Sequence, residues 1–200
     1  MDADWIRLEY SRQKKEIERA LQSYKDTQDY FYEMCFCLLT PQSNAFRCDA
    51  CVNILKGKRF HGSDVDLPPI LSRHTRFHNT KSENLLRMKE QFAKLSRNLS
   101  AIPDAYGKRE FLVSNVRGLG MKEASHFLRN IGHTALAILD RHILGHLASL
   151  HVIRSIPKSM SKQKYLAIEK AFISFGDKIG IPMDHLDLLF WSMETGRVFK

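Results

Sequence analysis

A glycine-punctuated turn between two helical segments is the feature that most constrains this chain. The turn is Val116-Arg117-Gly118-Leu119-Gly120, and Met121-Lys122 begin the second helical segment. Glycine adopts positive φ angles and lets another backbone come close. The N terminus of the following helix leaves N–H groups unpaired and carries a partial positive charge. Such a hairpin is either an ordinary corner between two helices or a site where backbone amides bind a phosphate.

Two ionisable residues follow this hairpin. Lys122 lies in the first turn of the helix, where the helix dipole disfavours an ammonium group and favours the neutral, nucleophilic amine. Asp140 ends the apolar run 135–139 just before another helical segment. It can act as an N-cap, or as a carboxylate that stabilises positive charge at a sugar C1′, and the two roles are compatible. The alternative for Lys122 is a solvated surface lysine.

Apolar residues recur at helical spacing along most of the chain. The apolar run 31–39 predicts a central buried helix, short helices are expected at 68–73 and 80–95, and Asp104 is a predicted N-cap. The expected helix ends are marked by Pro41, Gly57, Gly118, Gly132, Gly176 and Gly196. Strand-like alternation never extends beyond a few residues. The sequence therefore predicts an all-α fold of about nine to eleven helices.

The composition adds an expectation about partners. The chain has 31 Lys and Arg against 22 Asp and Glu, a net charge of +9. This excess indicates either a solvated basic surface or a polyanionic partner such as nucleic acid. An acidic N terminus without a signal-peptide pattern, and the lack of a run long enough to cross a bilayer, predict a soluble intracellular protein.

The four cysteines at positions 35, 37, 48 and 51 raise the possibility of zinc. Packing is the favoured interpretation, because Cys35 and Cys37 lie in an apolar helical run where cysteine behaves as a small hydrophobic residue. Residues two apart on a helix also point to different sides, which suits chelation poorly. The C-terminal region has no cysteines that could hold an iron–sulfur cluster.

The run G-L-G-M-K-E-A-S-H-F-L-R-N-I-G at 118–132, followed by A-I-L-D-R-H-I-L at 137–144, resembles the helix–hairpin–helix glycosylase superfamily. It is most similar to the 8-oxoguanine DNA glycosylase/lyase branch of archaea and some bacteria, and the resemblance covers nearly the whole chain. It implies the helix–hairpin–helix DNA glycosylase fold, with two helical lobes and an active site in the cleft between them. Residues 29–134 would form one lobe, with the hairpin at about 104–131, and residues 1–28 and 135–200 the other.

The same resemblance implies roles for residues near the hairpin. Lys122 would be the Schiff-base nucleophile and Asp140 the essential carboxylate. Gly118 and Gly120 would lie at the DNA backbone, and His142 near a phosphate.

The segment Leu38–Arg47 resembles the turn that enters the minor groove. Gln42 would fill the space left by the flipped nucleotide, and Arg47 would face the orphaned cytosine. The alternative is a polar turn at the start of a helix with one surface arginine.

Three further residues would recognise the base. The ending W-S-M-E-T-G-R-V-F-K at 191–200 resembles that of this branch, in which an aromatic residue stacks on the extruded base and the terminal lysine helps to recognise it. Trp191 and Lys200 occupy these places, and Phe77 is a candidate for the opposite face of the base. The alternatives are a core tryptophan and a loose chain end.

The implied chemistry is excision of 8-oxoguanine from double-stranded DNA, followed by β-elimination, with neither a metal nor an organic cofactor. We expect a monomer without a membrane partner, in the cytoplasm of a prokaryote and associated with the nucleoid. Two alternatives remain: the same chemistry on another oxidised base, and a DNA-binding protein without enzymatic activity. The lack of iron–sulfur cysteines and the terminal lysine argue against the thymine-glycol branch.

Overall fold

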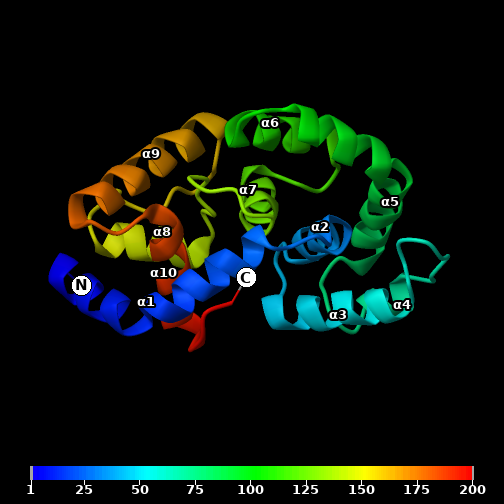
Figure 1. Ribbon diagram of the computed structural model, residues 1–200, viewed down its shortest axis with the longest axis horizontal. Helices are drawn as coiled ribbons and strands as arrows, with labels where there is room; N and C mark the ends of the chain where they lie inside the picture. Colours follow the sequence, from blue (N-terminus) through cyan, green and yellow to red (C-terminus); the bar gives the residue numbers. More distant parts are fainter. Residues whose placement is uncertain (1, 200) are drawn as a thin grey trace. The chain divides into compact units, whose positions relative to one another are not determined.

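The computed structural model describes residues 2–199, and these contain helices and loops but no β-strand (Figure 1). The predicted all-α fold is confirmed, and the number of helices in the described residues lies within the expected range. The ten helices are α1 (Ala3–Lys25), α2 (Tyr30–Leu39), α3 (Ala45–Gly57), α4 (Pro68–Leu71), α5 (His78–Ala101), α6 (Ala105–Asn115), α7 (Met121–Asn130), α8 (Arg141–Ser149), α9 (Lys162–Ile179) and α10 (Met183–Thr195).

The chain divides into two compact units. The central unit is Gln28–Phe127, and the terminal unit combines Met1–Thr27 with Leu128–Lys200. The division falls within helix α7, so the hairpin and the first turns of α7 belong to the central unit.

Helix α2 forms the core of the central unit. It contacts α3 and α5, and α5 in turn contacts α4 and α6. Every residue from Glu33 to Leu39 is buried, so this helix is enclosed on all sides, as its apolar sequence predicts. All four cysteines are free and buried, which fits a packing role. Burial raises the pKa of the Cys51 thiol to about 12, so this group remains protonated near neutral pH.

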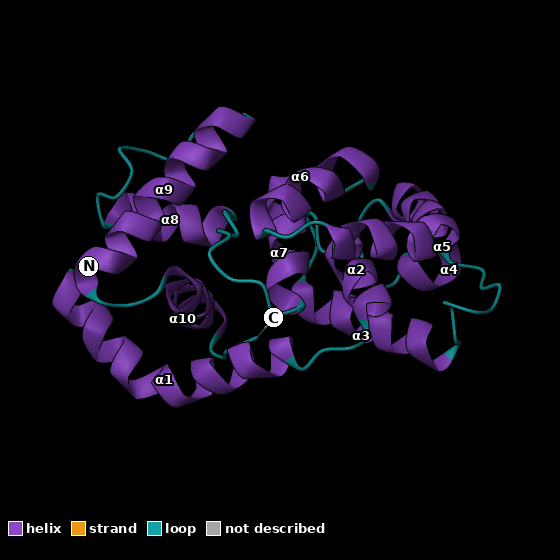
Figure 2. Cartoon of the chain, turned by 45° about the horizontal axis from the view of Figure 1, so that its top comes forward, coloured by secondary structure: helices purple, strands orange, loops and turns teal. Residues whose placement is uncertain are grey.

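Helix α10 is the core of the terminal unit. It contacts α1, α8 and α9, and Figure 2 shows it between α1 on one side and α8 and α9 on the other. Its buried face includes Leu186, Leu189 and Phe190, and Phe190 stacks against Phe172 of α9 at a centroid distance of 6.0 Å. Burial of these side chains is the main source of stability for the unit.

Several predicted helix ends are confirmed. Asp104 Oδ1 accepts a hydrogen bond of 2.8 Å from the backbone N–H of Gly107 and so caps α6. Gly196 follows α10 with a φ of 81°, the left-handed conformation in which glycine commonly ends a helix.

Two sequence-based expectations about helices are wrong. Gly176 does not end α9, which continues to Ile179 and is capped by Gly180. A Cβ at Gly176 would lie 2.6 Å from the carbonyl oxygen of Ile181, so this glycine allows a close backbone approach within the helix. The helix expected at 80–95 is not short but spans 24 residues, because its apolar face continues through Leu99.

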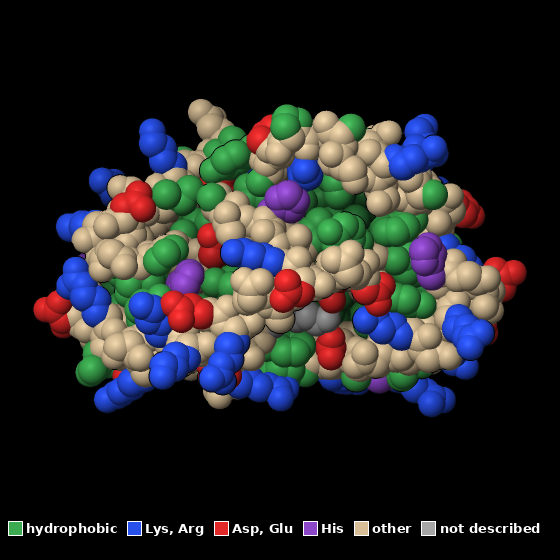
Figure 3. Space-filling model, in the orientation of Figure 1, with side chains coloured by type: hydrophobic (Ala, Val, Ile, Leu, Met, Phe, Trp, Pro, Cys, Tyr) green, Lys and Arg blue, Asp and Glu red, His purple; other side chains and the backbone are tan. Residues whose placement is uncertain are grey.

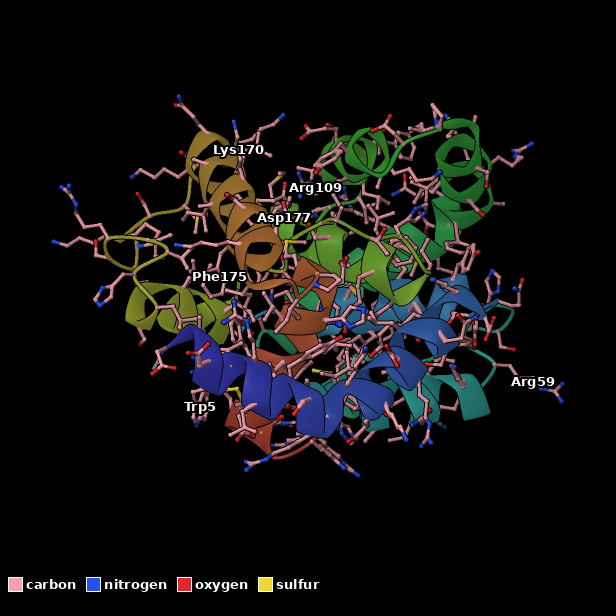
Figure 4. All side chains as sticks on the ribbon, turned by 60° about the vertical axis from the view of Figure 1, so that its left-hand side comes forward. Trp5, Arg59, Arg109, Lys170, Phe175 and Asp177 are labelled. Carbon is pink, nitrogen blue, oxygen red and sulfur yellow. The ribbon has the colours of Figure 1, made fainter. Side chains whose placement is uncertain are left out.

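Basic side chains are spread over the face of the molecule that Figure 3 shows. On the face shown in Figure 3, Lys and Arg are interspersed with Asp and Glu. Arg59, which follows α3, extends away from the ribbon, and Lys170 is exposed on α9 (Figure 4). On this face the basic residues therefore do not mark one binding surface. No helix in the described part of the chain is long and apolar enough to cross a membrane.

Candidate active site

The hairpin between α6 and α7 needs a glycine at position 118 for two reasons. Gly118 has a φ of 97°, and a Cβ there would lie 2.5 Å from Asn84 Nδ2 and 3.2 Å from a methyl carbon of Leu38. The turn is closed by a hydrogen bond from Leu119 N–H to the carbonyl of Val116. The hairpin thus packs tightly against α2 and α5, while Gly118 and Gly120 themselves remain exposed.

Lys122 lies in the first turn of α7 beside a carboxylate. Its Nζ is 3.1 Å from Glu123 Oε1, and 27% of its side chain is exposed. The other oxygen of Glu123 accepts a hydrogen bond of 3.3 Å from Gly120 N–H, one of the unpaired donors at the start of the helix. Glu123 therefore caps the helix and pairs with the lysine at the same time.

Asp140 is the N-cap of α8, as the sequence predicts. Its Oδ1 accepts hydrogen bonds from the backbone N–H groups of His142 (2.8 Å) and Ile143 (2.9 Å). Both cap bonds use Oδ1, so the capping role does not require Oδ2.

The extended segment before Asp140 is fixed by α9. Glu169 Oε2 accepts a hydrogen bond of 2.8 Å from Ala137 N–H. Tyr165 Oη donates a bond of 2.5 Å to the carbonyl of Ala137 and accepts one of 3.4 Å from Leu139 N–H. Because these partners are buried, the position of Asp140 within the terminal unit is well defined.

A buried charge cluster near Asp140 was not found by sequence reasoning. Arg129 Nη1 lies 3.3 Å from Asp187 Oδ2, and both Asp184 oxygens accept the backbone N–H of Ala135. Burial raises the pKa of the Asp187 carboxyl to about 7; the Arg129 guanidinium opposes this shift, and the carboxylates of Asp140 and Asp184 add to it. Asp187 and Asp140 thus interact electrostatically. The sequence does hold a signal for this cluster, because Asp184 and Asp187 lie among the apolar positions of α10.

His142 is half-buried at the start of α8. Its Nδ1 lies 3.4 Å from Glu194 Oε2, and the other oxygen of Glu194 lies 3.1 Å from His146 Nε2. Arg141 Nε donates to His142 Nε2 at 3.2 Å. Burial lowers the pKa of His146, although Glu194 opposes the shift, so His146 is neutral near pH 7.

The predicted base-recognition residues are placed as follows. Trp191 is part-buried on α10, and its ring centroid is 5.8 Å from that of Phe199. Phe77 precedes α5 with 54% of its surface exposed, and the guanidinium of Arg76 lies over its ring. Lys200 lies outside the described residues.

The turn after α2 carries Gln42 and leads to Arg47. Gln42 is exposed with a φ of 54°, and Asn44 caps α3 by accepting the backbone N–H of Arg47. The Arg47 guanidinium donates to the carbonyl oxygen of Arg73. Beneath this turn lies Lys81, which is 5% exposed. Sequence reasoning missed Lys81, although it occupies the apolar face of α5 together with Leu85 and Met88, and a lysine in that register is unusual.

The comparisons with known proteins agree on one family. A family model described as 8-oxoguanine DNA glycosylase matches residues 11–181. The chain belongs to the 8-oxoguanine DNA glycosylase family.

The similarity to individual members of the family extends over nearly the whole length of both chains. A Fusobacterium nucleatum protein named 8-oxoguanine DNA glycosylase/AP lyase is 36% identical, covering 96% of this chain and 94% of that protein. The crystal structure of Methanocaldococcus jannaschii 8-oxoguanine DNA glycosylase matches with a TM-score of 0.89 at 32% identity, covering 99% and 95% of the two chains. A structure of the M. jannaschii glycosylase/lyase with a 15mer DNA containing 8-oxoguanine matches with a TM-score of 0.86 at 33% identity, over 94% and 93%. The resemblance read from residues 118–144 is therefore confirmed.

The candidate residues of this family member divide between its two units. The central unit contains the hairpin glycines, Lys122 and the exposed Gln42 and Phe77. The terminal unit contains Asp140, His142 and Trp191. Within each unit the side chains are held by the contacts described above.

Proposed function

We propose that this chain is a bifunctional DNA glycosylase/AP lyase that excises 8-oxoguanine and then nicks the strand. The observation that carries the proposal is the position of Lys122, directly after the glycine hairpin in the first turn of α7, with 27% of its side chain exposed. A phosphate bound by the hairpin amides would place the adjacent sugar close to this amine. Membership of the 8-oxoguanine DNA glycosylase family supports the choice of lesion.

In the proposed mechanism, the lesion is first flipped out of the duplex, at a cost of a few kcal/mol. The neutral amine of Lys122 attacks C1′, and the N-glycosidic bond breaks with its electron pair leaving on the base, which is protonated and released. The C1′–O4′ bond then opens to give an imine with Lys122. Loss of a 2′ proton expels the 3′ phosphate, and hydrolysis of the imine returns the free lysine and a 3′ unsaturated aldehyde.

Asp140 has two functions in this proposal. Its Oδ1 caps α8, and its negative charge stabilises the cationic character that develops at C1′ as the base departs. The backbone bonds orient the carboxylate before substrate binds, so no reorganisation is required during the reaction. His142, ordered by Glu194, is proposed to lie at a DNA phosphate.

We propose that aromatic and polar groups recognise the lesion. Trp191 and Phe77 would stack on the extruded base, each contributing about 1–3 kcal/mol, and Lys200 would help to identify it. Gln42 would occupy the vacated position in the duplex, and Arg47 would face the cytosine. We propose that the enzyme acts on double-stranded DNA as a monomer, in the cytoplasm and at the nucleoid.

A comparison of three duplexes tests this function. One carries 8-oxoguanine opposite cytosine, one carries thymine glycol, and one is undamaged. We expect free 8-oxoguanine and a nicked strand from the first duplex only. Binding without base release would favour a non-enzymatic DNA-binding protein, and equal cleavage of the thymine-glycol duplex would assign the chemistry to a different lesion.

A further inference from the structure

Two exposed residues of the central unit share an unusual backbone conformation. Gln42 has a φ of 54° and Phe77 a φ of 56°. The left-handed region is unfavourable for a residue that has a Cβ. Such residues persist where the surrounding structure determines them. We call the turns that carry Gln42 and Phe77 the two corners. Contacts with other parts of the unit must hold both corners in this conformation.

The two corners are joined by side-chain hydroxyls. Ser43 Oγ lies 2.8 Å from Thr75 Oγ1 and accepts the backbone N–H of Arg76 at 3.0 Å. Thr75 Oγ1 also donates to the carbonyl oxygen of Leu39 at 2.9 Å. Ser43 directly follows Gln42, and Arg76 directly precedes Phe77. The backbones on which these two side chains depend are thus connected by one small network.

Lys81 lies at the centre of this network. Its Nζ is 2.7 Å from the carbonyl oxygens of both Leu39 and Pro41. It is also 3.0 Å from Ser43 Oγ and 2.6 Å from Thr75 Oγ1. An ammonium group has three N–H donors, so these four oxygens use its full capacity.

The buried ammonium is costly to the fold. Lys81 is 5% exposed, and the four oxygens around it are neutral carbonyls and hydroxyls. Removing a charge from water is unfavourable unless hydrogen bonds compensate for the loss of hydration. An apolar side chain could fill the same space without that cost, but it could not bind the carbonyls on either side of the turn.

We propose that Lys81 is a positioning residue that holds the corners bearing Gln42 and Phe77 at a fixed spacing before DNA binds. The inference rests on the proposed function, in which Gln42 enters the duplex and Phe77 stacks on the extruded base. Fixing both corners beforehand removes the entropy loss that would otherwise accompany flipping. Lys81 thereby acts on lesion extrusion and is not itself a catalytic residue.

The test compares two substrates in single-turnover reactions. One is a duplex with 8-oxoguanine opposite cytosine, from which the base must be flipped and excised, and the other carries a pre-formed abasic site. The variants are Lys81→Met, Thr75→Val and the control Lys94→Met, which changes an exposed lysine on the same helix. Folding is checked by circular dichroism, and flipping by the fluorescence of 2-aminopurine next to the lesion.

We expect Lys81→Met to lower the excision rate at least ten-fold, with a matching loss of the 2-aminopurine signal. Cleavage at the abasic site should change less than three-fold, and Lys94→Met should match the wild type in both assays. If Lys81→Met does not fold, Thr75→Val takes its place in the test. We expect this variant to lose excision of 8-oxoguanine and to keep cleavage at the abasic site. Folded variants that excise at the wild-type rate, or that lose both activities equally, would overturn the inference. A wild type that excises no 8-oxoguanine would instead refute the proposed function.

Discussion

The Nζ of Lys122 lies 3.1 Å from Oε1 of Glu123, whose second oxygen accepts the backbone N–H of Gly120. This ion pair holds the Nζ beside Glu123, whereas the proposed nucleophile must leave the carboxylate to reach C1′. Glu123 therefore restrains the lysine when no substrate is bound. The carboxylate also orders the first turn of α7, so its charge and its hydrogen bond have separable effects.

Glu123→Gln separates these effects, because the amide oxygen can still accept the Gly120 N–H while the charge is lost. We expect borohydride trapping of the variant on an abasic duplex to be a few-fold faster than wild type at every pH tested, because the Glu123 carboxylate no longer holds the Nζ of Lys122. Trapping rates measured from pH 6 to pH 8 provide the check. Slower trapping at every pH would mean that the carboxylate assists the chemistry directly.

Asp140→Asn tests whether the carboxylate does more than cap α8. Asparagine is as good an N-cap as aspartate, so the free energy of unfolding should change by less than about 1 kcal/mol. Excision of 8-oxoguanine should fall by at least about a hundred-fold, because the negative charge that stabilises C1′ is absent. Urea denaturation and single-turnover excision give the two values. Normal excision by the variant would reduce Asp140 to a structural cap.

The raised pKa of Asp187 predicts a pH-dependent stability. The folded-state carboxyl titrates at about 7 because it is buried, whereas in the unfolded chain it titrates near 4. The folded state therefore binds more protons between these values, so this stabilising contribution is complete below about pH 4 and is lost as pH rises through 7.

Asp187→Asn should remove that slope. Free energies of unfolding measured for both proteins from pH 4 to pH 8 should show the wild type losing more stability than the variant, by at most about 4 kcal/mol. Parallel curves would show that Asp187 is ionised throughout this range, and would count against its burial as the dominant influence.

The lowered pKa of Lys81 predicts a pH dependence of flipping. Burial lowers this pKa to about 8; Cys48 and Glu123 raise it, and the cations of Lys122 and Arg76 lower it. Above pH 8 the amine has two N–H donors where the ammonium has three. The ratio of excision on 8-oxoguanine duplex to cleavage at an abasic site should fall about two-fold to three-fold from pH 7 to pH 9, as expected for one weakened hydrogen bond.

This ratio cancels the contribution of Lys122, which is needed for both reactions. In Lys81→Met the ratio should be low and should not vary with pH. A wild-type ratio that stays constant, or rises, across this range would contradict the role of the ammonium in holding the two corners.

Features that depend on local chemistry could be predicted from the sequence. The caps at Asp104 and Asp140 and the glycine end at Gly196 were expected, because a capping side chain bonds to residues two or three positions away. The enclosed helix 30–39 followed from its apolar composition. The family was recognised from residues 118–144, which combine the hairpin with Lys122 and Asp140.

Features that depend on contacts between residues distant in sequence could not be predicted from the sequence. Gly176 resembles a helix stop, yet it is a glycine because the carbonyl of Ile181 approaches it. The role of Lys81 depends on oxygens 6 to 42 residues away. The pairing of Arg129 with Asp187 spans 58 residues. The position of Asp187 among apolar residues of α10 indicates a buried carboxylate, but it does not indicate the partner.

The central claim is that Lys122 forms a covalent intermediate with DNA, and borohydride trapping tests it most directly. Wild-type protein incubated with an 8-oxoguanine duplex and borohydride should give a protein–DNA adduct that maps to Lys122. Lys122→Gln should give no adduct and no strand cleavage while still binding the duplex, and Lys94→Met should trap like the wild type. A Lys122→Gln protein that is trapped at the wild-type rate would contradict the account.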